Sequence, residues 1–171
     1  MWATVLISRR TFLGSALATA SLAGCSSSPR LLTYDGPPVT SVVVNKAARQ
    51  MYLLSGSTVL CDHRIDLRSD PVGPKRVEGD GRTPEGLYVV DRRNPRSQYY
   101  LSVGISYPNA RDVANAQAMG LPPGGDIFFH GTPPEKQRGT DWTAGCMAVS
   151  NREIEELSAM LRDGTPVFIN P

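Results

Sequence analysis

Two residues with complementary chemistry, Cys146 and His130, stand sixteen positions apart in a chain of 171 residues that holds three cysteines and two histidines. The segment between them is polar and contains glycine and proline, so each residue can lie at the end of a packed element and face the other. A free thiol has an ordinary pKa of about 8.5, and a nearby imidazole can accept its proton. The pair predicts a cysteine nucleophile with a histidine as its general base.

The turn that leads into the cysteine, Thr143-Ala144-Gly145-Cys146, predicts how an intermediate would be stabilised. Its backbone amides can donate hydrogen bonds to a developing oxyanion, and Gly145 lets another segment of backbone approach closely. Attack of the thiolate on an amide carbonyl would give a thioester, which an amine or water then resolves. A backbone carbonyl would be enough to orient His130.

Other roles are open for the same residues. Cys146 can be a buried structural cysteine, and His130 can be a residue that merely ends a strand. Cys61 and His63 share one face of an expected strand, and with His130 and Cys146 they would make a Cys₂His₂ zinc set. The wide spacing between His130 and Cys146 is unlike that of structural zinc sites, so we predict no metal and no cofactor. We expect Cys61 in the core and His63 solvated or partly packed.

These motifs resemble those of the L,D-transpeptidase catalytic domain, the YkuD-type family of peptidoglycan enzymes. That family carries His-Gly followed by Ser/Thr-His-Gly-Cys, matched here by His130-Gly131 and by residues 143–146. It also carries a Thr-Pro-x-Gly turn, matched by Thr83-Pro84-Glu85-Gly86. The resemblance spans roughly residues 40–170. It implies a mostly β fold, a single L,D-transpeptidase-like β-sandwich domain with a few short helices.

The resemblance also implies the reaction. Cys146 would form an acyl-enzyme with a peptidoglycan stem peptide at the L,D-amide after diaminopimelate, and D-alanine would leave. Ala144 replaces the second histidine of most members, and Ala148 replaces an arginine that many have. Residues 141–151 resemble a branch with periplasmic enzymes that act on the bond between peptidoglycan and a covalently attached lipoprotein. A hydrolase that detaches a lipoprotein or trims peptidoglycan is therefore an alternative to the transpeptidase, and a non-catalytic peptidoglycan-binding lipoprotein is a second one.

Four residues are candidates for binding the substrate: Gly131, Arg82, Tyr107 and Trp142. Arg82 lies in a long loop with Lys75, where both can meet stem-peptide carboxylates or simply be solvated. Tyr107 and Trp142 can line the groove or pack in the core. The polar insert between His130 and Cys146 is expected to form a lid-like loop over that groove.

Residues 1–24 have the features of an export signal. The stretch Ser8-Arg9-Arg10-Thr11-Phe12-Leu13 places twin arginines before an apolar run that is shorter than the roughly 20 residues of a membrane-spanning helix. This pattern indicates the twin-arginine route. Leu22-Ala23-Gly24-Cys25 resembles a lipobox, so Cys25 is predicted to carry the lipid of a membrane-anchored lipoprotein that faces the periplasm or cell envelope. An ordinary cleaved signal is the alternative.

The rest of the chain is predicted to be a flexible tether, residues 25–39, followed by the catalytic domain, residues 40–171. Loss of residues 1–24, which contain two arginines and no acidic residue, lowers the formal net charge from +2 to 0. No basic stripe remains for a nucleic acid. The predicted partners are peptidoglycan stem peptides, the membrane through the lipid anchor, and a peptidoglycan-linked lipoprotein.

Short β-branched and apolar segments predict strands at residues 41–45, 50–54, 58–67, 87–90, 98–105, 126–130 and 165–169. The first three predict an antiparallel meander. A short helix is expected over residues 110–119, and a better-marked helix after Ser150, where Glu153 completes a capping box and Gly164 ends the helix. Residues 68–86 have no apolar period and predict a long loop, of a length that is usually functional.

Overall fold

The computed structural model describes residues 28–171 of the protein. These residues form a mostly β domain with two short helices, which confirms the expected fold class. The predicted export signal and the predicted lipidation site, Cys25, lie outside the described residues. Within residues 28–171, no helix is long and apolar enough to cross a membrane.

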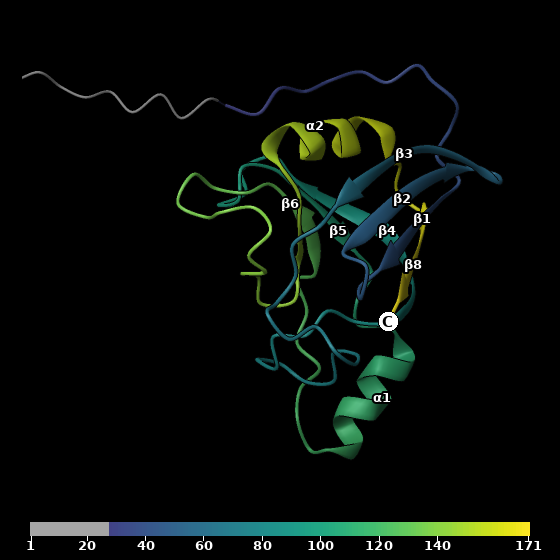
Figure 1. Ribbon diagram of the computed structural model, residues 1–171. Helices are drawn as coiled ribbons and strands as arrows, with labels where there is room; N and C mark the ends of the chain where they lie inside the picture. Colours follow the sequence, from purple (N-terminus) through teal and green to yellow (C-terminus); the bar gives the residue numbers. More distant parts are fainter. Residues whose placement is uncertain (1–27) are drawn as a thin grey trace, which may run out of the picture.

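The described chain forms eight strands and two helices (Figure 1): β1 (Ser41–Asn45), β2 (Gln50–Ser55), β3 (Thr58–Arg64), β4 (Gly86–Asn94), β5 (Ser102–Ile105), α1 (Ala110–Ala118), β6 (Phe128–His130), β7 (Met147–Ala148), α2 (Asn151–Met160) and β8 (Pro166–Asn170). The strands form one sheet in the order β3-β2-β1-β8-β4-β5-β6-β7. β1, β2 and β3 pair antiparallel, as the predicted meander requires. β8 returns from the end of the chain and lies between β1, to which it is parallel, and β4.

The sheet curls at β4, which belongs to both of its halves. The first residues of β4, from Gly86 to Val89, pair with β8, and later residues pair with β5. The pairing with β5 shifts register between Val90 and Arg92, and such an irregularity bends a strand and increases its twist. α2 packs over β5 and β6, and α1 lies at the opposite end of the molecule (Figure 1).

Alternating side chains of the strands make the hydrophobic core. Every second residue of β1 and of β8 is buried, the pattern of strands with one face inward. Each fully buried aliphatic side chain stabilises the folded state by roughly 1.5–3 kcal/mol relative to an exposed one. The central strands and α2 supply much of this core, through Val42, Val44, Met51, Leu53, Val90, Val167, Ile154 and Leu157.

β3 and β7 differ from the sequence prediction. β3 ends at Arg64 instead of residue 67, because Asp66 leaves the meander and pairs with Ala148 of β7. Their amides and carbonyls exchange two hydrogen bonds of 2.8 and 2.9 Å. β7 was not predicted, since two residues are too short for a periodic signal. The chain after β3 thus ties the meander to the strand that follows the nucleophile candidate.

β5 and β6 are shorter than predicted because the backbone before each of them is not extended. Tyr100 has a φ of 74° and Asp126 a φ of 56°, both in the left-handed region. β5 therefore begins at Ser102 instead of residue 98, and β6 begins at Phe128 instead of residue 126.

α2 begins as predicted and ends earlier. Ser150 accepts a hydrogen bond from the Glu153 amide, and the Glu153 side chain accepts one from the Ser150 amide, which is the predicted capping box. The helix ends at Leu161, whose ψ of 140° is extended. The prediction that Gly164 ends the helix is wrong, because Gly164, with a φ of 85°, lies in the turn before β8.

The long loop of residues 68–86 is held by a buried lysine. The Lys46 ammonium, 1% exposed, donates to the carbonyls of Gly73 and Thr83 and to the Glu85 carboxylate, at 2.7, 3.1 and 2.7 Å. Burial lowers the pKa of Lys46, and the contact with Glu85 partly offsets this effect. The Asp80 carboxylate accepts hydrogen bonds from three backbone amides of the same loop. The loop thus has a defined course.

Candidate active site

His130 is the last residue of β6, and Cys146 immediately precedes β7, the strand beside it. The two strands are parallel, with Phe129 opposite Met147 and His130 opposite Ala148. Because Phe129 and Met147 face the core, the flanking residues of each strand face the other side of the sheet. The same register places Cys146 beside Phe128, about 8 Å from His130 between Cα atoms, from ideal strand spacings. Among residues 28–171, no hydrogen bond joins the two side chains.

The imidazole of His130 is buried and held in one orientation. Its Nδ1 lies 2.7 Å from the carbonyl oxygen of Gly131, which can only accept, so Nδ1 carries the proton and Nε2 keeps its lone pair. The ring stacks on Tyr99 at 4.5 Å between centroids and lies 5.5 Å from Trp142. Burial lowers the pKa of His130, and the bond to Gly131 partly offsets this. The neutral, base-competent imidazole therefore prevails at neutral pH.

The thiol of Cys146 is partly exposed and is not paired with a cation. Its Sγ donates to the carbonyl of Asp126 at 3.3 Å. Burial raises the pKa of Cys146, and the backbone amide of Phe128 lowers it in part. The pair consequently rests as a thiol and a neutral imidazole, so the thiolate has to form when a substrate arrives.

The turn before the cysteine depends on Gly145. Gly145 has a φ of 124°, and a Cβ there would lie 2.7 Å from the Arg82 carbonyl oxygen of the long loop. Thr143 braces the turn, because its hydroxyl donates to the Cys146 carbonyl at 2.7 Å and its amide to the Leu67 carbonyl at 2.9 Å. The Thr143 amide is thus occupied in this structure, and Ala144 is exposed at the apex of the turn.

The other candidate residues divide into two groups. The ring of Trp142 contacts His130. Gly131 is buried next to His130 in the chain, and a Cβ at position 131 would lie 2.4 Å from the Asn151 side chain. Arg82 reaches the cysteine turn through its carbonyl oxygen. Tyr107, by contrast, is 3% exposed in the hydrophobic core and donates to the Pro123 carbonyl. Its ring meets Tyr88 of β4 edge-on, at 5.9 Å between ring centroids.

Sequence reasoning missed the residues that orient the histidine and the insert. Tyr99 has no sequence mark that distinguishes it from other tyrosines. Asn151 is the first residue of α2, and its side chain accepts from the Thr132 amide at 3.0 Å and so fixes the chain after His130. Asp66 accepts from the amide of Gly139 in the insert at 2.7 Å. These contacts join segments that are distant in the sequence.

The described residues contain no group of three or more His, Cys, Asp or Glu side chains arranged to hold a metal ion. Cys61 and His63 contact each other and residues of α2, away from His130 and Cys146. The four residues of the zinc hypothesis therefore do not come together.

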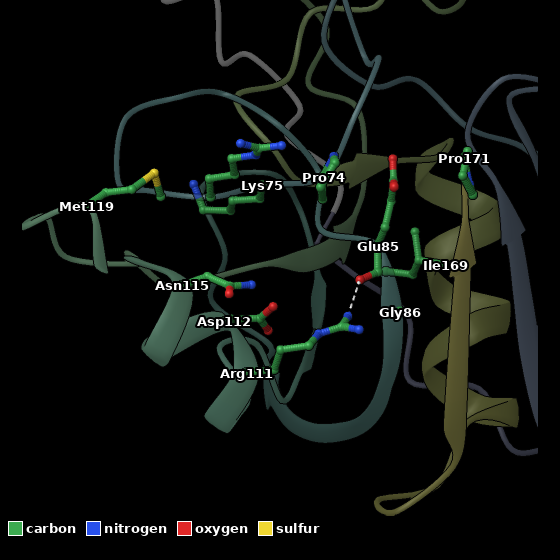
Figure 2. A pocket seen from close by; sticks show the side chains of 11 residues that line it. Pro74, Lys75, Glu85, Gly86, Arg111, Asp112, Asn115, Met119, Ile169 and Pro171 are labelled. Carbon is green, nitrogen blue, oxygen red and sulfur yellow. Dashed lines mark hydrogen bonds between the residues drawn. The ribbon is translucent and has the colours of Figure 1, made fainter. Parts of the chain in front are cut away.

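A separate pocket of about 710 Å³ lies between the long loop, α1 and the end of β8 (Figure 2). Arg111 projects into it from α1 and donates to the Glu85 carbonyl at 3.3 Å. Glu85 and Asp112 also line this pocket, so it has mixed charge. Neither His130 nor Cys146 lines it.

A curled β-sheet that carries a histidine and a glycine-preceded cysteine on neighbouring strands defines a candidate acyl-transfer site of the L,D-transpeptidase class. The family model of the L,D-transpeptidase catalytic domain (YkuD) matches residues 40–169, and the chain belongs to this family. The resemblance inferred from the motifs is thereby confirmed.

Similar proteins support the same family. The putative L,D-transpeptidase YafK of Escherichia coli K12 is 27% identical over 173 residues, which are 99% of this chain and 65% of YafK. The helical cell shape determining protein Pgp2 of Campylobacter jejuni has a TM-score of 0.60 and 26% identity, over 83% of this chain and 51% of Pgp2. Bd1075 of Bdellovibrio bacteriovorus shares the fold, with a TM-score of 0.56 and 21% identity over 81% of this chain and 51% of that protein. The chain spans about two thirds of YafK and half of Pgp2.

Proposed function

We propose that the protein is an L,D-transpeptidase that acts on peptidoglycan stem peptides, with Cys146 as nucleophile and His130 as general base. The observation that carries this proposal is the bond from His130 Nδ1 to the Gly131 carbonyl, because it leaves Nε2 as the basic atom on the strand next to the cysteine. Family membership of residues 40–169 supports the same reaction class.

In this mechanism His130 Nε2 takes the proton of Cys146 as Sγ attacks the carbonyl carbon of the L,D-amide. The amides of Ala144–Cys146 are the candidate oxyanion donors, each worth roughly 10²–10³ in rate. Collapse of the intermediate breaks the amide bond, and the leaving D-alanine amine takes the proton from His130. An acceptor then gives its proton to His130, attacks the thioester and restores the thiol.

The acceptor is an amine in the proposed transpeptidation, which serves cell-wall biogenesis. Hydrolysis is the alternative, with detachment of a lipoprotein or trimming of stem peptides as its outcome. One observation favours it: Ala148, where many family members carry an arginine, is fully buried and offers no side-chain donor to an acceptor carboxylate. Retention of both His130 and Cys146 argues against a lipoprotein that binds peptidoglycan without chemistry.

We further propose that the protein is exported by the twin-arginine route and anchored by a lipid on Cys25, facing the periplasm or cell envelope. The support is the sequence of residues 8–25. Metabolic labelling with a fatty acid analogue, compared between wild type and Cys25→Ala, tests this part separately from the chemistry.

The activity is tested by mixing the protein with tetrapeptide muropeptides and following products by mass spectrometry. We expect wild type to release D-alanine, Cys146→Ala to release none, and Cys61→Ala to match wild type. Cross-linked products identify transpeptidation, and shortened monomers identify hydrolysis. If wild type leaves every muropeptide and every peptidoglycan-linked lipoprotein unchanged, the enzymatic proposal is wrong.

A further inference from the structure

A second thiol–imidazole–carboxylate group lies outside the candidate active site, on the edge strand β3. Cys61 and His63 project from the same face of β3, and Cys61 Sγ lies 3.6 Å from His63 Nε2. The other ring nitrogen, Nδ1, lies 3.5 Å from the Glu153 carboxylate of α2. His63 is only 6% exposed, so the expectation that it is solvated or partly packed is corrected, whereas Cys61 remains partly exposed.

The surroundings of His63 favour its protonated form. Burial alone would lower the pKa of His63, but the contacts with Cys61 and Glu153 outweigh this effect and raise it to about 9. Burial likewise opposes ionisation of Glu153, but its contacts with His63, Ser150 and Arg138 lower its pKa to about 2. At neutral pH an imidazolium therefore stands between an anionic carboxylate and the sulfur, and it can donate a hydrogen bond to each.

The carboxylate that holds His63 is itself fixed. Glu153 accepts from the Ser150 amide at 2.6 Å in the capping box and pairs with Arg138 of the insert at 3.2 Å. Arg138 also donates to the Arg64 carbonyl at 2.8 Å. The titratable groups facing His63 are therefore Cys61 on its own strand and Glu153 on α2, with Arg138 behind the latter.

We propose that Cys61 is a reactive thiol of this protein, activated by His63 and Glu153, and that it is a modification site for low-molecular-weight disulfides. In the exchange, Cys61 Sγ, whose proton is held by the His63 ring, attacks one sulfur of the disulfide. One S–S bond breaks and another forms, and the released thiolate takes a proton from the imidazolium, so the step needs no other oxidant. A nearby imidazolium stabilises the attacking thiolate, as at other reactive cysteines.

The sulfur atoms of the two described cysteines have different neighbours. Cys146 Sγ contacts a backbone carbonyl and has no cationic neighbour within hydrogen-bonding distance, whereas Cys61 Sγ contacts a protonated ring. Within residues 28–171, the other side-chain partner of Cys61 Sγ is the Met160 sulfur, at 4.0 Å, which is a weak partner. Disulfides and alkylating agents should therefore choose Cys61 over Cys146 near neutral pH.

The test follows each cysteine of the full chain separately, because trypsin places Cys25, Cys61 and Cys146 in different peptides, residues 11–30, 50–64 and 139–152. The folded protein is treated with iodoacetamide, or with glutathione disulfide, at a series of pH values. We expect the Cys61 adduct to form about tenfold faster than the Cys146 adduct at pH 6.5. We also expect its rate to rise less steeply from pH 6 to 8 than the rate of an unassisted thiol, which rises about tenfold per pH unit there.

His63→Gln should slow Cys61 labelling at pH 6.5 about tenfold and restore the steep rise with pH. Asp62→Asn, on the opposite face of β3, is the matched control and should keep the wild-type profile. Glu153→Gln provides a second variant in case His63→Gln does not fold, and should give an intermediate profile. The proposal is overturned if wild-type Cys61 shows the unassisted pH profile, if neither variant changes it, or if Cys61 reacts only after unfolding. These readouts do not depend on whether Cys146 is catalytic.

Discussion

At the scale of single residues, the candidate chemistry requires that the His130 ring is neutral and held in one orientation. The Gly131 carbonyl fixes the proton on Nδ1, while Tyr99 and Trp142 exclude water from the ring. Exclusion of water disfavours the imidazolium and lowers the pKa of His130. A base with a lowered pKa stays deprotonated at more acidic pH, so the site is suited to work below the pH at which an ordinary histidine becomes protonated.

Tyr99→Ala should raise the pKa of His130 towards the ordinary value of 6.5, because it exposes the ring to water. The acid limb of D-alanine release should move to higher pH by the same amount, since protonated His130 cannot act as a base. NMR titration of the two histidines measures the pKa directly and does not require activity. Tyr34→Ala is the control and should leave the titration unchanged, because the Tyr34 hydroxyl donates to the Pro37 carbonyl and not to a group beside His130. A wild-type His130 that titrates at or above 6.5 would contradict this account.

At the scale of elements, local signals determined what the sequence could predict. Ser150 and Glu153 predicted the start of α2 because a capping box forms within four residues. β1 and β2 were predicted from short-range patterns. The insertion of β8 between β1 and β4, and the pairing of Asp66 with Ala148, depend on contacts between distant segments, for which the pattern of a single sequence contains no signal.

The same distinction applies to the site. His130 and Cys146 were predicted because their types and spacing match a family motif, and the structure places them on neighbouring strands. The stacking of Tyr99 on His130 and the approach of the Arg82 carbonyl to Gly145 result from the folding of two long loops. The close approach of backbone to Gly145 was predicted, but the sequence did not identify Arg82 as the residue that approaches.

Gly145→Ala should disrupt the cysteine turn. Its φ of 124° is unfavourable for alanine, and the new Cβ would meet the Arg82 carbonyl oxygen at 2.7 Å. Backbone strain and the clash together should cost about 3 kcal/mol or more in the free energy of unfolding, and D-alanine release should fall at least about tenfold. Urea unfolding and the muropeptide assay measure the two effects.

Gly139→Ala is the matched control within the same insert. Gly139 also has a positive φ, 82°, but a Cβ there would meet nothing within 4 Å. The substitution Gly139→Ala should therefore lower the free energy of unfolding by only about 1 kcal/mol, which is the strain of an alanine in the left-handed region. Equal effects of the two substitutions on stability and activity would show that the close approach of Arg82 is unimportant.

At the scale of the whole molecule, the segment before the domain is attached to α2. The Arg30 amide donates to Glu155 Oε1 at 2.7 Å, and its guanidinium pairs with Oε2 at 3.2 Å. Glu155 is 2% exposed and also accepts from the Tyr100 hydroxyl, so this buried carboxylate obtains part of its hydrogen bonds from the predicted tether. Figure 1 shows the segment passing along α2. With Cys25 lipidated as proposed, five residues reach at most about 18 Å, and the α2 side would face the membrane.

Glu155→Gln should release this segment and speed tryptic cleavage after Arg30. Arg30 is 71% exposed, so its ion pair is worth little, and the expected acceleration is roughly three- to tenfold. The rate is measured well below the melting temperature of each variant, by mass spectrometry of the product that begins at Leu31. Glu156→Gln, at the neighbouring position of α2 where the side chain pairs with Arg152, is the control and should cleave at the wild-type rate. Equal rates in wild type and Glu155→Gln would mean that the segment moves freely in solution, and an anchored domain would then have no preferred orientation at the membrane.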